Sequence, residues 1–270
     1  MNTSQDSRFQ SDAVTALSQT SRLSRFAHKL RPKLARLFGC QRNVAQQIET
    51  VSPANPNIPG SVYIKAGSIL AGADVREPIF DRQVKVPKFD LDRVRHTGVF
   101  SIGAGGLFGQ QARGLVRKGY PRIGCADSDV FAPSNYPRQL CYGPDLYVNK
   151  AVAVVQNLAH ECLADTELWA YPLHYPDVAR HIDWDKFDVF LCNVDNNIAR
   201  VRVSVDGRAR KKVVIFSAVS NDAGIGYVFI QDNQPGSPCF GCVFPHKCDD
   251  TIRPCPGTPA RAAARNSRCR

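Results

Sequence analysis

Short apolar runs and amphipathic stretches alternate along the chain after residue 97. The apolar runs predict buried strands at 99–102, 122–126, 189–192, 213–217 and 227–230. Apolar residues at helical spacing predict helices near 107–118, over 150–161 and from about 197 to 209. Strand–helix alternation of this kind indicates an α/β fold with a mostly parallel sheet and helices on both faces.

The N-terminal part has a different pattern. Residues 1–20 are rich in Ser, Thr and Gln, which predicts disorder. In 22–38, apolar residues recur at helical spacing with basic residues between them. This segment could pack on its own body, or contact an acidic membrane surface or a partner. Because 51–60 is rich in Pro and Asn and predicts a linker, we assign 1–60 to a basic, partly disordered extension and linker.

The C-terminal residues 258–270 are basic and lack a core-forming pattern. We therefore place the folded domain at 61–257 and interpret the tail as the product of a truncation or a shifted reading frame. The net charge of +11 is concentrated in the tails: residues 1–42 carry +6, and 258–270 hold four Arg and no acid. The nearly neutral body argues against nucleic acid as a partner.

Membrane insertion and secretion are not expected from this sequence. No run approaches the eighteen apolar residues of a transmembrane helix, and Met1–Gln10 lacks the apolar stretch of a secretory signal. We therefore expect a cytoplasmic protein without a membrane span.

A glycine-rich junction stands between the strand at 99–102 and the following helix. Gly103, Gly105 and Gly106 would let backbone N–H groups approach a phosphate at the helix N-terminus. Asp127 ends the next predicted strand, where an acid can accept hydrogen bonds from ribose hydroxyls. This arrangement predicts a Rossmann-like nucleotide site; the alternative is a tight turn that binds nothing.

Charged and amide side chains follow the later strands in order. They occur in Asp127-Ser128-Asp129, in Ser134–Gln139, at Lys150, and in Asp195-Asn196-Asn197 with Arg200. Cationic groups such as Arg138 and Lys150 can neutralise a triphosphate, and Asp195 can hold Mg²⁺, which needs few protein carboxylates. Each of these residues, taken alone, could be an ordinary surface charge. Their recurrence at strand ends favours ATP over a dinucleotide, because hydride transfer needs none of them.

Together these motifs resemble the ThiF/MoeB-type adenylyltransferases, relatives of ubiquitin-activating enzymes. The matching segments, from about residue 80 to 257, are Phe80-Asp81-Arg82-Gln83, Gly103–Leu107, Asp127-x-Asp129, Ser134-Asn135-x-x-Arg138-Gln139, Lys150, Asp195-Asn196 with Arg200, and Cys239-x-x-Cys242. The resemblance implies that ATP adenylates the C-terminal glycine carboxylate of a ubiquitin-like or sulfur-carrier protein ending in Gly-Gly, with release of pyrophosphate.

The resemblance also implies roles for single residues. Asp127 and Asp129 would face the ribose and the reacting region, and Asp195 would bind Mg²⁺. The phosphates would be contacted by Asn135, Arg138 and Lys150, and Gln139 belongs to the same nucleotide-binding set. Arg82 matches the arginine that reaches across a homodimer into the partner's site in this family; the alternative is an ordinary exposed arginine.

Four of the ten cysteines lie within residues 239–255. Cys239-x-x-Cys242 has the spacing of a zinc knuckle, but the second pair usual in the family is missing, so two packed or exposed thiols are the alternative to Zn²⁺. Cys255 stands where the family often places a reactive cysteine. It could take the activated carboxylate, ligate zinc, or do neither.

Phe108 departs from the family pattern, which usually has glycine at this position. We expect its phenyl group to crowd the nucleotide or the helix–strand contact. This leaves two alternatives to an adenylating enzyme. One is a catalytically weak nucleotide-binding or scaffold protein, and the other is an NAD-dependent oxidoreductase.

Overall fold

The structure, a computed structural model, describes residues 48–67, 79–220 and 223–245. All of them belong to one compact unit, Ala45–Arg270, and the other unit is Met1–Val44. The basic segment 22–38, Cys255 and the tail 258–270 lie outside the described residues. Within the described part, no helix is both long enough and apolar enough to cross a membrane.

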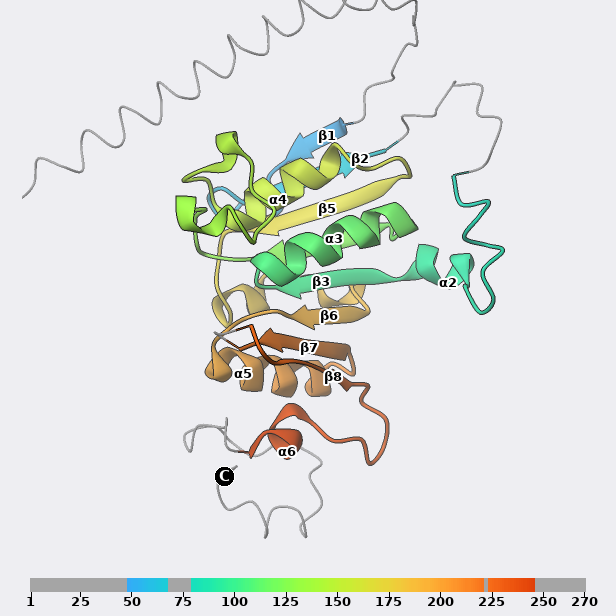
Figure 1. The fold of residues 1–270 in the computed structure, drawn as a ribbon, viewed down its shortest axis with the longest axis vertical. Helices are drawn as coiled ribbons and strands as arrows, with labels where there is room; N and C mark the ends of the chain where they lie inside the picture. The colour runs from blue at the N-terminus through green and yellow to red at the C-terminus, as the bar shows by residue number, and fades with distance from the viewer. Residues whose placement is uncertain (1–47, 68–78, 221–222, 246–270) are drawn as a thin grey trace, which may run out of the picture. The chain divides into compact units, whose positions relative to one another are not determined.

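The centre of the unit is a single sheet (Figure 1). Its strands are β1 (Ile48–Ser52), β2 (Val62–Ala66), β3 (Gly98–Ile102), β4 (Arg122–Ala126), β5 (Thr166–Tyr171), β6 (Val189–Cys192), β7 (Val213–Val219) and β8 (Gly226–Gln231). They lie in the order β1-β2-β5-β4-β3-β6-β7-β8. The five strands β3 to β7 are parallel, whereas β1, β2 and β8 pair antiparallel at the two sides. The expected mostly parallel sheet is therefore confirmed.

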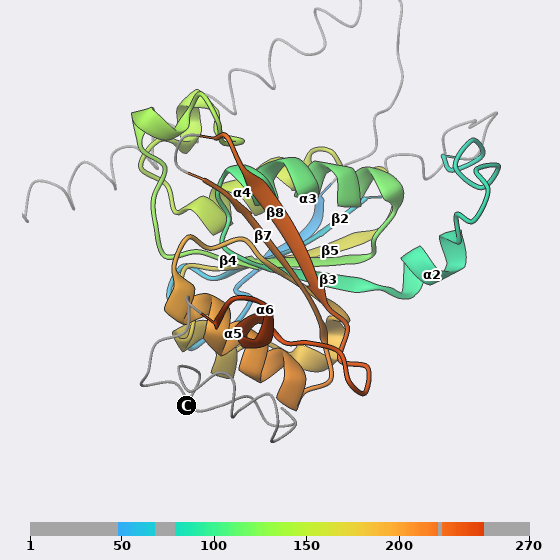
Figure 2. The ribbon, with the colours of Figure 1, turned by 60° about the horizontal axis from the view of Figure 1, so that its bottom comes forward.

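Helices cover both faces of this sheet (Figure 2). The α-helices are α2 (Leu91–His96), α3 (Gly106–Lys118), α4 (Lys150–Ala159), α5 (Asn197–Ala209) and α6 (Phe240–Val243). Helices α3 and α4 lie on one face, and α5 and α6 lie on the other. Short 3₁₀ turns occur at η1 (Pro133–Asn135), η2 (Gly143–Asp145), η3 (Asp177–Arg180) and η4 (Trp184–Lys186).

Alternate residues of the central strand serve two separate cores. In β3, Val99 packs into the apolar cluster under α3 and α4, whereas Phe100 packs into the cluster on the α5 face. There the Phe100 ring centroid lies 5.1 Å from that of Phe187 and 5.8 Å from that of Phe190. Both faces of the strand are apolar because both are covered, as expected for a parallel strand between two helical layers.

The folded part begins before the boundary that the sequence pattern suggested. Strand β1 includes Val51 and Ser52, which the pattern assigned to a linker, and it pairs with β2. Ile58 is only 5% exposed and belongs to the core on the α5 face. The pattern missed β1 because this edge strand is mostly exposed, so its sequence carries no buried stripe.

Candidate functional site

A cavity of about 390 Å³ opens where the sheet order reverses. β3 pairs with β4 on one side and with β6 on the other, so the chain leaves their carboxyl ends in diverging directions. The cavity is lined by Ile102, Gly103, Gly105, Ala126, Asp127, Ser128, Asp129, Gln139, Lys150, His174, Tyr175, Asn193, Val194, Asp195, Asn196 and Ala199. The residues that follow β3, β4 and β6 thus meet in one place, as the strand-end motifs predicted.

The glycine loop follows β3 and leads into α3. Gly103 has φ +95°, and a Cβ there would lie 2.9 Å from the carbonyl oxygen of Asn193. A side chain is therefore excluded by backbone conformation and by space. The helix begins at Gly106, and its N-cap residue, Gly105, supplies no side-chain cap. The first N–H groups of α3 consequently remain available for an anion.

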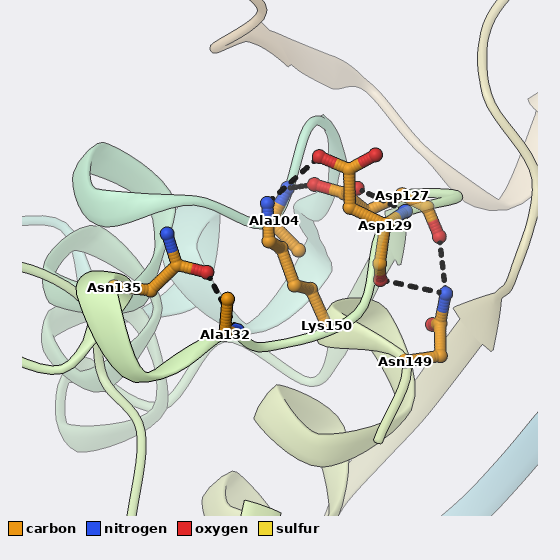
Figure 3. A network of polar contacts seen from close by, with 7 residues as sticks. All are labelled: Ala104, Asp127, Asp129, Ala132, Asn135, Asn149 and Lys150. Carbon is orange, nitrogen blue, oxygen red and sulfur yellow. Dashed lines mark hydrogen bonds and ion pairs between the residues drawn. The ribbon is translucent and has the colours of Figure 1, made fainter. Parts of the chain in front are cut away.

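Asp127 joins the glycine loop to the turn after β4 (Figure 3). Its Oδ2 accepts a hydrogen bond from the backbone N–H of Ala104 at 2.8 Å, and its Oδ1 accepts one from Asp129 at 2.9 Å. Burial raises the pKa of this carboxyl, while the two backbone donors and Lys150 oppose the shift. Each carboxylate oxygen retains acceptor capacity for a ligand hydroxyl.

Lys150 is held against the same turn. Its Nζ lies 2.8 Å from Oδ2 of Asp129, and its backbone N–H donates to the carbonyl oxygen of Asp129, also at 2.8 Å. Asn149 caps α4 by accepting from Val152 and donates to the carbonyl oxygens of Asp127 and Asp129 (Figure 3). These contacts fix an ammonium group, only 11% exposed, at the border of the cavity.

The motif 134–139 is divided by the structure. Gln139 lines the cavity, and its Oε1 is buried without a hydrogen-bond partner among the described residues. Asn135 instead accepts from the backbone N–H of Ala132 at 3.0 Å, which stabilises its own turn (Figure 3). The guanidinium of Arg138 is exposed and donates to the carbonyl oxygen of Ser134 at 3.0 Å. Neither Asn135 nor Arg138 belongs to the described lining of the cavity.

Asp195 lies at the beginning of α5. Its carboxylate is exposed and lines the cavity, whereas Asn196 caps the helix by accepting from Ile198 and Ala199. Among the described residues, no group of three His, Cys, Asp or Glu side chains could hold a metal ion. A single carboxylate beside a triphosphate is nevertheless a donor set that suits Mg²⁺, which takes its other ligands from phosphate and water.

Arg82 lies apart from these groups. It is exposed in the segment that precedes α2 and does not belong to the described lining of the cavity. The neighbouring Phe80 packs on Gly119, which ends α3. The cavity lies at the other end of α3, a helix of 13 residues that is about 20 Å long.

The position of Phe108 corrects one expectation from the sequence. Phe108 is fully buried in the core under α3 and α4, and it is absent from the described cavity lining. Its ring therefore does not crowd the nucleotide space. The close approach that glycine permits occurs one residue later, because a Cβ on Gly109 would lie 2.8 Å from Cβ of Leu140.

The thiols of Cys239 and Cys242 lie 3.2 Å apart at the start of α6. Cys239 is buried and Cys242 is exposed. Two zinc-bound sulfurs are separated by roughly 3.8 Å in a tetrahedral site, so this pair would have to open slightly to share a metal. Cys248, Cys255 and Cys269 are not among the described residues, so the zinc and nucleophile hypotheses remain predictions.

Three polar residues of the described lining were not predicted: His174, Tyr175 and Asn193. Asn193 directly follows β6, so its position at a strand end could have revealed it. Tyr175 and His174 belong to the irregular connection between β5 and β6. No periodic pattern marks them there, because no helix or long strand surrounds them.

Comparison with known proteins agrees with this architecture. The model of the ThiF family matches residues 80–265. "Adenylyltransferase and sulfurtransferase uba4" of Emericella nidulans is 26% identical over 79% of this chain and 45% of its own length. "Adenylyltransferase and sulfurtransferase MOCS3" of Drosophila yakuba is 26% identical over 84% of this chain and 51% of its own length. The chain therefore spans about half the length of these relatives.

Among solved structures, E. coli MccB aligns with a TM-score of 0.49 and 19% identity over 56% of this chain and 42% of its own. The family match covers more than half of the chain and includes the glycine loop, Asp127, Lys150 and Asp195. The chain belongs to the ThiF family.

Proposed function

We propose that this protein is an ATP-dependent adenylyltransferase that activates the C-terminal glycine of a ubiquitin-like or sulfur-carrier protein. The observation that carries the proposal is the meeting of three residues around one cavity: Asp127 after β4, Lys150 at the start of α4 and Asp195 after β6. Family membership and the adenylyltransferase relatives support it.

The geometry suits transfer of an adenylyl group. A carboxylate oxygen of the carrier would attack the α-phosphorus, and the bond to the β-phosphate oxygen would break to release pyrophosphate. Negative charge grows on the leaving pyrophosphate, and the fixed ammonium of Lys150 would stabilise it. Asp127 would hold the ribose, and the uncapped N-terminus of α3 would face phosphate oxygens.

Other groups complete the proposed site. Asp195 would hold Mg²⁺, which would neutralise phosphate charge when bound. Arg138 and Asn135 would join the nucleotide set only if the 133–140 segment turned toward the cavity. Arg82 would act from a second copy in a homodimer, and Cys239 with Cys242 would supply two ligands to Zn²⁺. Cys255 would accept the activated carboxylate. The protein would act in the cytoplasm.

The decisive experiment is ATP–pyrophosphate exchange with candidate carrier proteins ending in Gly-Gly. We expect exchange that depends on Mg²⁺ and on the carrier, and a loss of about 100-fold or more in Asp195→Ala. Asp185→Asn, an exposed acid that does not belong to the described lining of the cavity, is the matched control. Unchanged exchange in Asp195→Ala would remove the Mg²⁺ assignment.

The same experiment separates the alternatives. ATP binding without exchange, with every carrier tested, would favour a nucleotide-binding scaffold protein. Binding of NAD in preference to ATP would favour an oxidoreductase. Either result would overturn the adenylyltransferase proposal.

A further inference from the structure

The lining of the nucleotide cavity has an apolar side and a polar side. Its apolar members belong to or pack against the core on the α5 face: Ile102, Ala126, Tyr175, Val194 and Ala199. Lys150, which begins α4 on the opposite face, and Gln139 supply polar groups. A triphosphate needs the polar side, so the planar base of the nucleotide is left with the apolar side.

Tyr175 is the aromatic member of the apolar side and is only 6% exposed. Its hydroxyl donates a hydrogen bond to Oδ2 of Asp206, which lies on α5. Burial and this hydrogen bond raise the pKa of Tyr175, so the hydroxyl stays a neutral donor. A buried tyrosine hydroxyl requires such a partner, and here the partner also determines where the ring lies.

Asp206 is itself held in place. Its Oδ1 lies 3.1 Å from Nη1 of Arg210, one helical turn further along α5. The guanidinium of Arg210 lies 4.4 Å from the ring centroid of Trp184. Tyr175 and Trp184 both belong to the connection between β5 and β6, so two contacts tie this connection to one helix. The wall of the cavity that Tyr175 forms is thus attached to α5 near the C-terminal end of the helix, through Asp206 and Arg210.

We propose that Tyr175 forms the wall against which the nucleobase packs, and that Asp206 is a positioning residue that holds this ring through its hydroxyl. The proposal rests on the proposed function, since it assumes that ATP occupies the cavity. The proposal assigns the base to the α5 side of the cavity. Different residues would then recognise the base and the phosphates.

The test measures two ligands that share a triphosphate: ATP, which also carries the base and the ribose, and inorganic tripolyphosphate, which carries neither. Dissociation constants are determined by titration calorimetry with the full chain. We expect Tyr175→Ala to raise the Kd for ATP roughly tenfold, the usual scale for base–aromatic contact, and to change the Kd for tripolyphosphate less than about twofold. Lys150→Met should weaken both ligands, because its charge contacts the phosphates.

A pair of substitutions at Asp206 tests positioning independently. Asp206→Asn keeps an acceptor for the tyrosine hydroxyl and should bind ATP within about twofold of the wild type. Asp206→Leu removes the acceptor and should reproduce most of the loss seen in Tyr175→Ala. Asp92→Asn, at an exposed position on α2 outside the described lining, serves as the control. Melting temperatures of the nucleotide-free variants report whether each one folds.

The outcomes are distinguishable. Equal ATP affinity in the wild type and Tyr175→Ala, or a parallel loss for ATP and tripolyphosphate, overturns the assignment of the base to Tyr175. Equal loss in Asp206→Asn and Asp206→Leu overturns the positioning role. If the wild-type protein does not bind ATP, the proposed function fails and the inference fails with it.

Discussion

Asp127 serves the fold and the ligand with the same carboxylate. Its two oxygens accept the backbone N–H groups of Ala104 and Asp129, and the glycine loop is thereby fixed to the turn after β4. Burial disfavours the charge that this task requires, and the raised pKa reflects that cost. A rise in pH should therefore weaken the contribution of this residue to folding stability and strengthen nucleotide binding.

The direction of each effect follows from the raised pKa. The folded protein binds a proton at Asp127 more readily than the unfolded chain does. This contribution to stability is therefore fully present below the unfolded-state pKa and is lost as the pH rises through the folded-state pKa. ATP affinity should fall as the pH falls through the same folded-state pKa, because a protonated carboxyl is a poorer acceptor for ribose hydroxyls.

The dissociation constant for ATP, measured at a series of pH values from about 7 to about 4, reports this effect. The wild type should lose affinity with an inflection above the usual aspartate range. Asp127→Asn should bind more weakly at neutral pH and lack that inflection. An identical pH profile in the two proteins would show that another group controls the binding.

At the scale of the element, α3 carries two interior glycines in different surroundings. A Cβ on Gly109 would lie 2.8 Å from Cβ of Leu140, whereas a Cβ on Gly114 would meet nothing within 4 Å. Leu140 follows Gln139, which lines the cavity. The absence of a side chain at Gly109 thus lets the 133–140 segment approach the helix, and Gly114 has no such role.

The two positions form a matched pair of substitutions. Gly114→Ala should stabilise the protein by about 0.5–1 kcal/mol, because alanine is the better helix former. Gly109→Ala should destabilise it by about 1–3 kcal/mol, because Leu140 must move. Chemical denaturation gives both free energies of unfolding. Equal stabilisation by the two changes would contradict the close packing of the segment on α3.

The sequence predicted the elements that carry a periodic signal. The strands β3, β4, β6, β7 and β8 and the helices α3, α4 and α5 lie within about two residues of their expected bounds. β1 was missed because it lies at the sheet's edge and is mostly exposed, and β2 was missed because its five residues mix buried and exposed positions without a long apolar run. β5 was missed although it is largely buried, since Thr166–Tyr171 mixes polar and aromatic residues without alternation.

The site was predictable in the same uneven way. Strand-end residues such as Asp127 and Asp195 line the cavity, as expected. Their positions could be predicted because the end of a strand determines where the residues that follow it lie. Asn135 and Arg138 were expected at the phosphates, yet their side chains here stabilise their own turn, and loop conformation does not follow from a motif. The position of the Tyr175 ring depends on a hydrogen bond to Asp206, which follows 31 positions later. Spacing along the chain cannot reveal such a contact.

At the scale of the whole molecule, Arg82 and the cavity lie at opposite ends of α3. Because the length of α3, about 20 Å, lies between the segment of Arg82 and the glycine loop, we expect Arg82 to assist the reaction from a second copy. Two inactive variants should then complement each other, since a mixed dimer of Arg82→Ala and Asp195→Ala contains one intact site.

Co-refolding equal amounts of the two variants provides the measurement. Random pairing should restore roughly a quarter of the wild-type exchange rate, because half of the dimers are mixed and each has one intact site. Arg93→Ala, at an exposed position on α2, is the control and should retain activity by itself. A mixture as inactive as its components would contradict action of Arg82 across a dimer.

The position of β2 beside β5 has a consequence for synthesis of the chain. Tyr63 and Glu167 form a hydrogen bond of 3.1 Å although 104 positions separate them. The β1–β2 hairpin leaves the ribosome first, but its partner strand follows only after β3, α3, β4 and α4 have been made. Until then the hairpin has no sheet to join, and an isolated hairpin is only marginally stable. The β1–β2 hairpin is thus made before the strand that it pairs with, and a deletion that removes both strands, through Ala66, should reduce soluble yield by exposing the edge of β5.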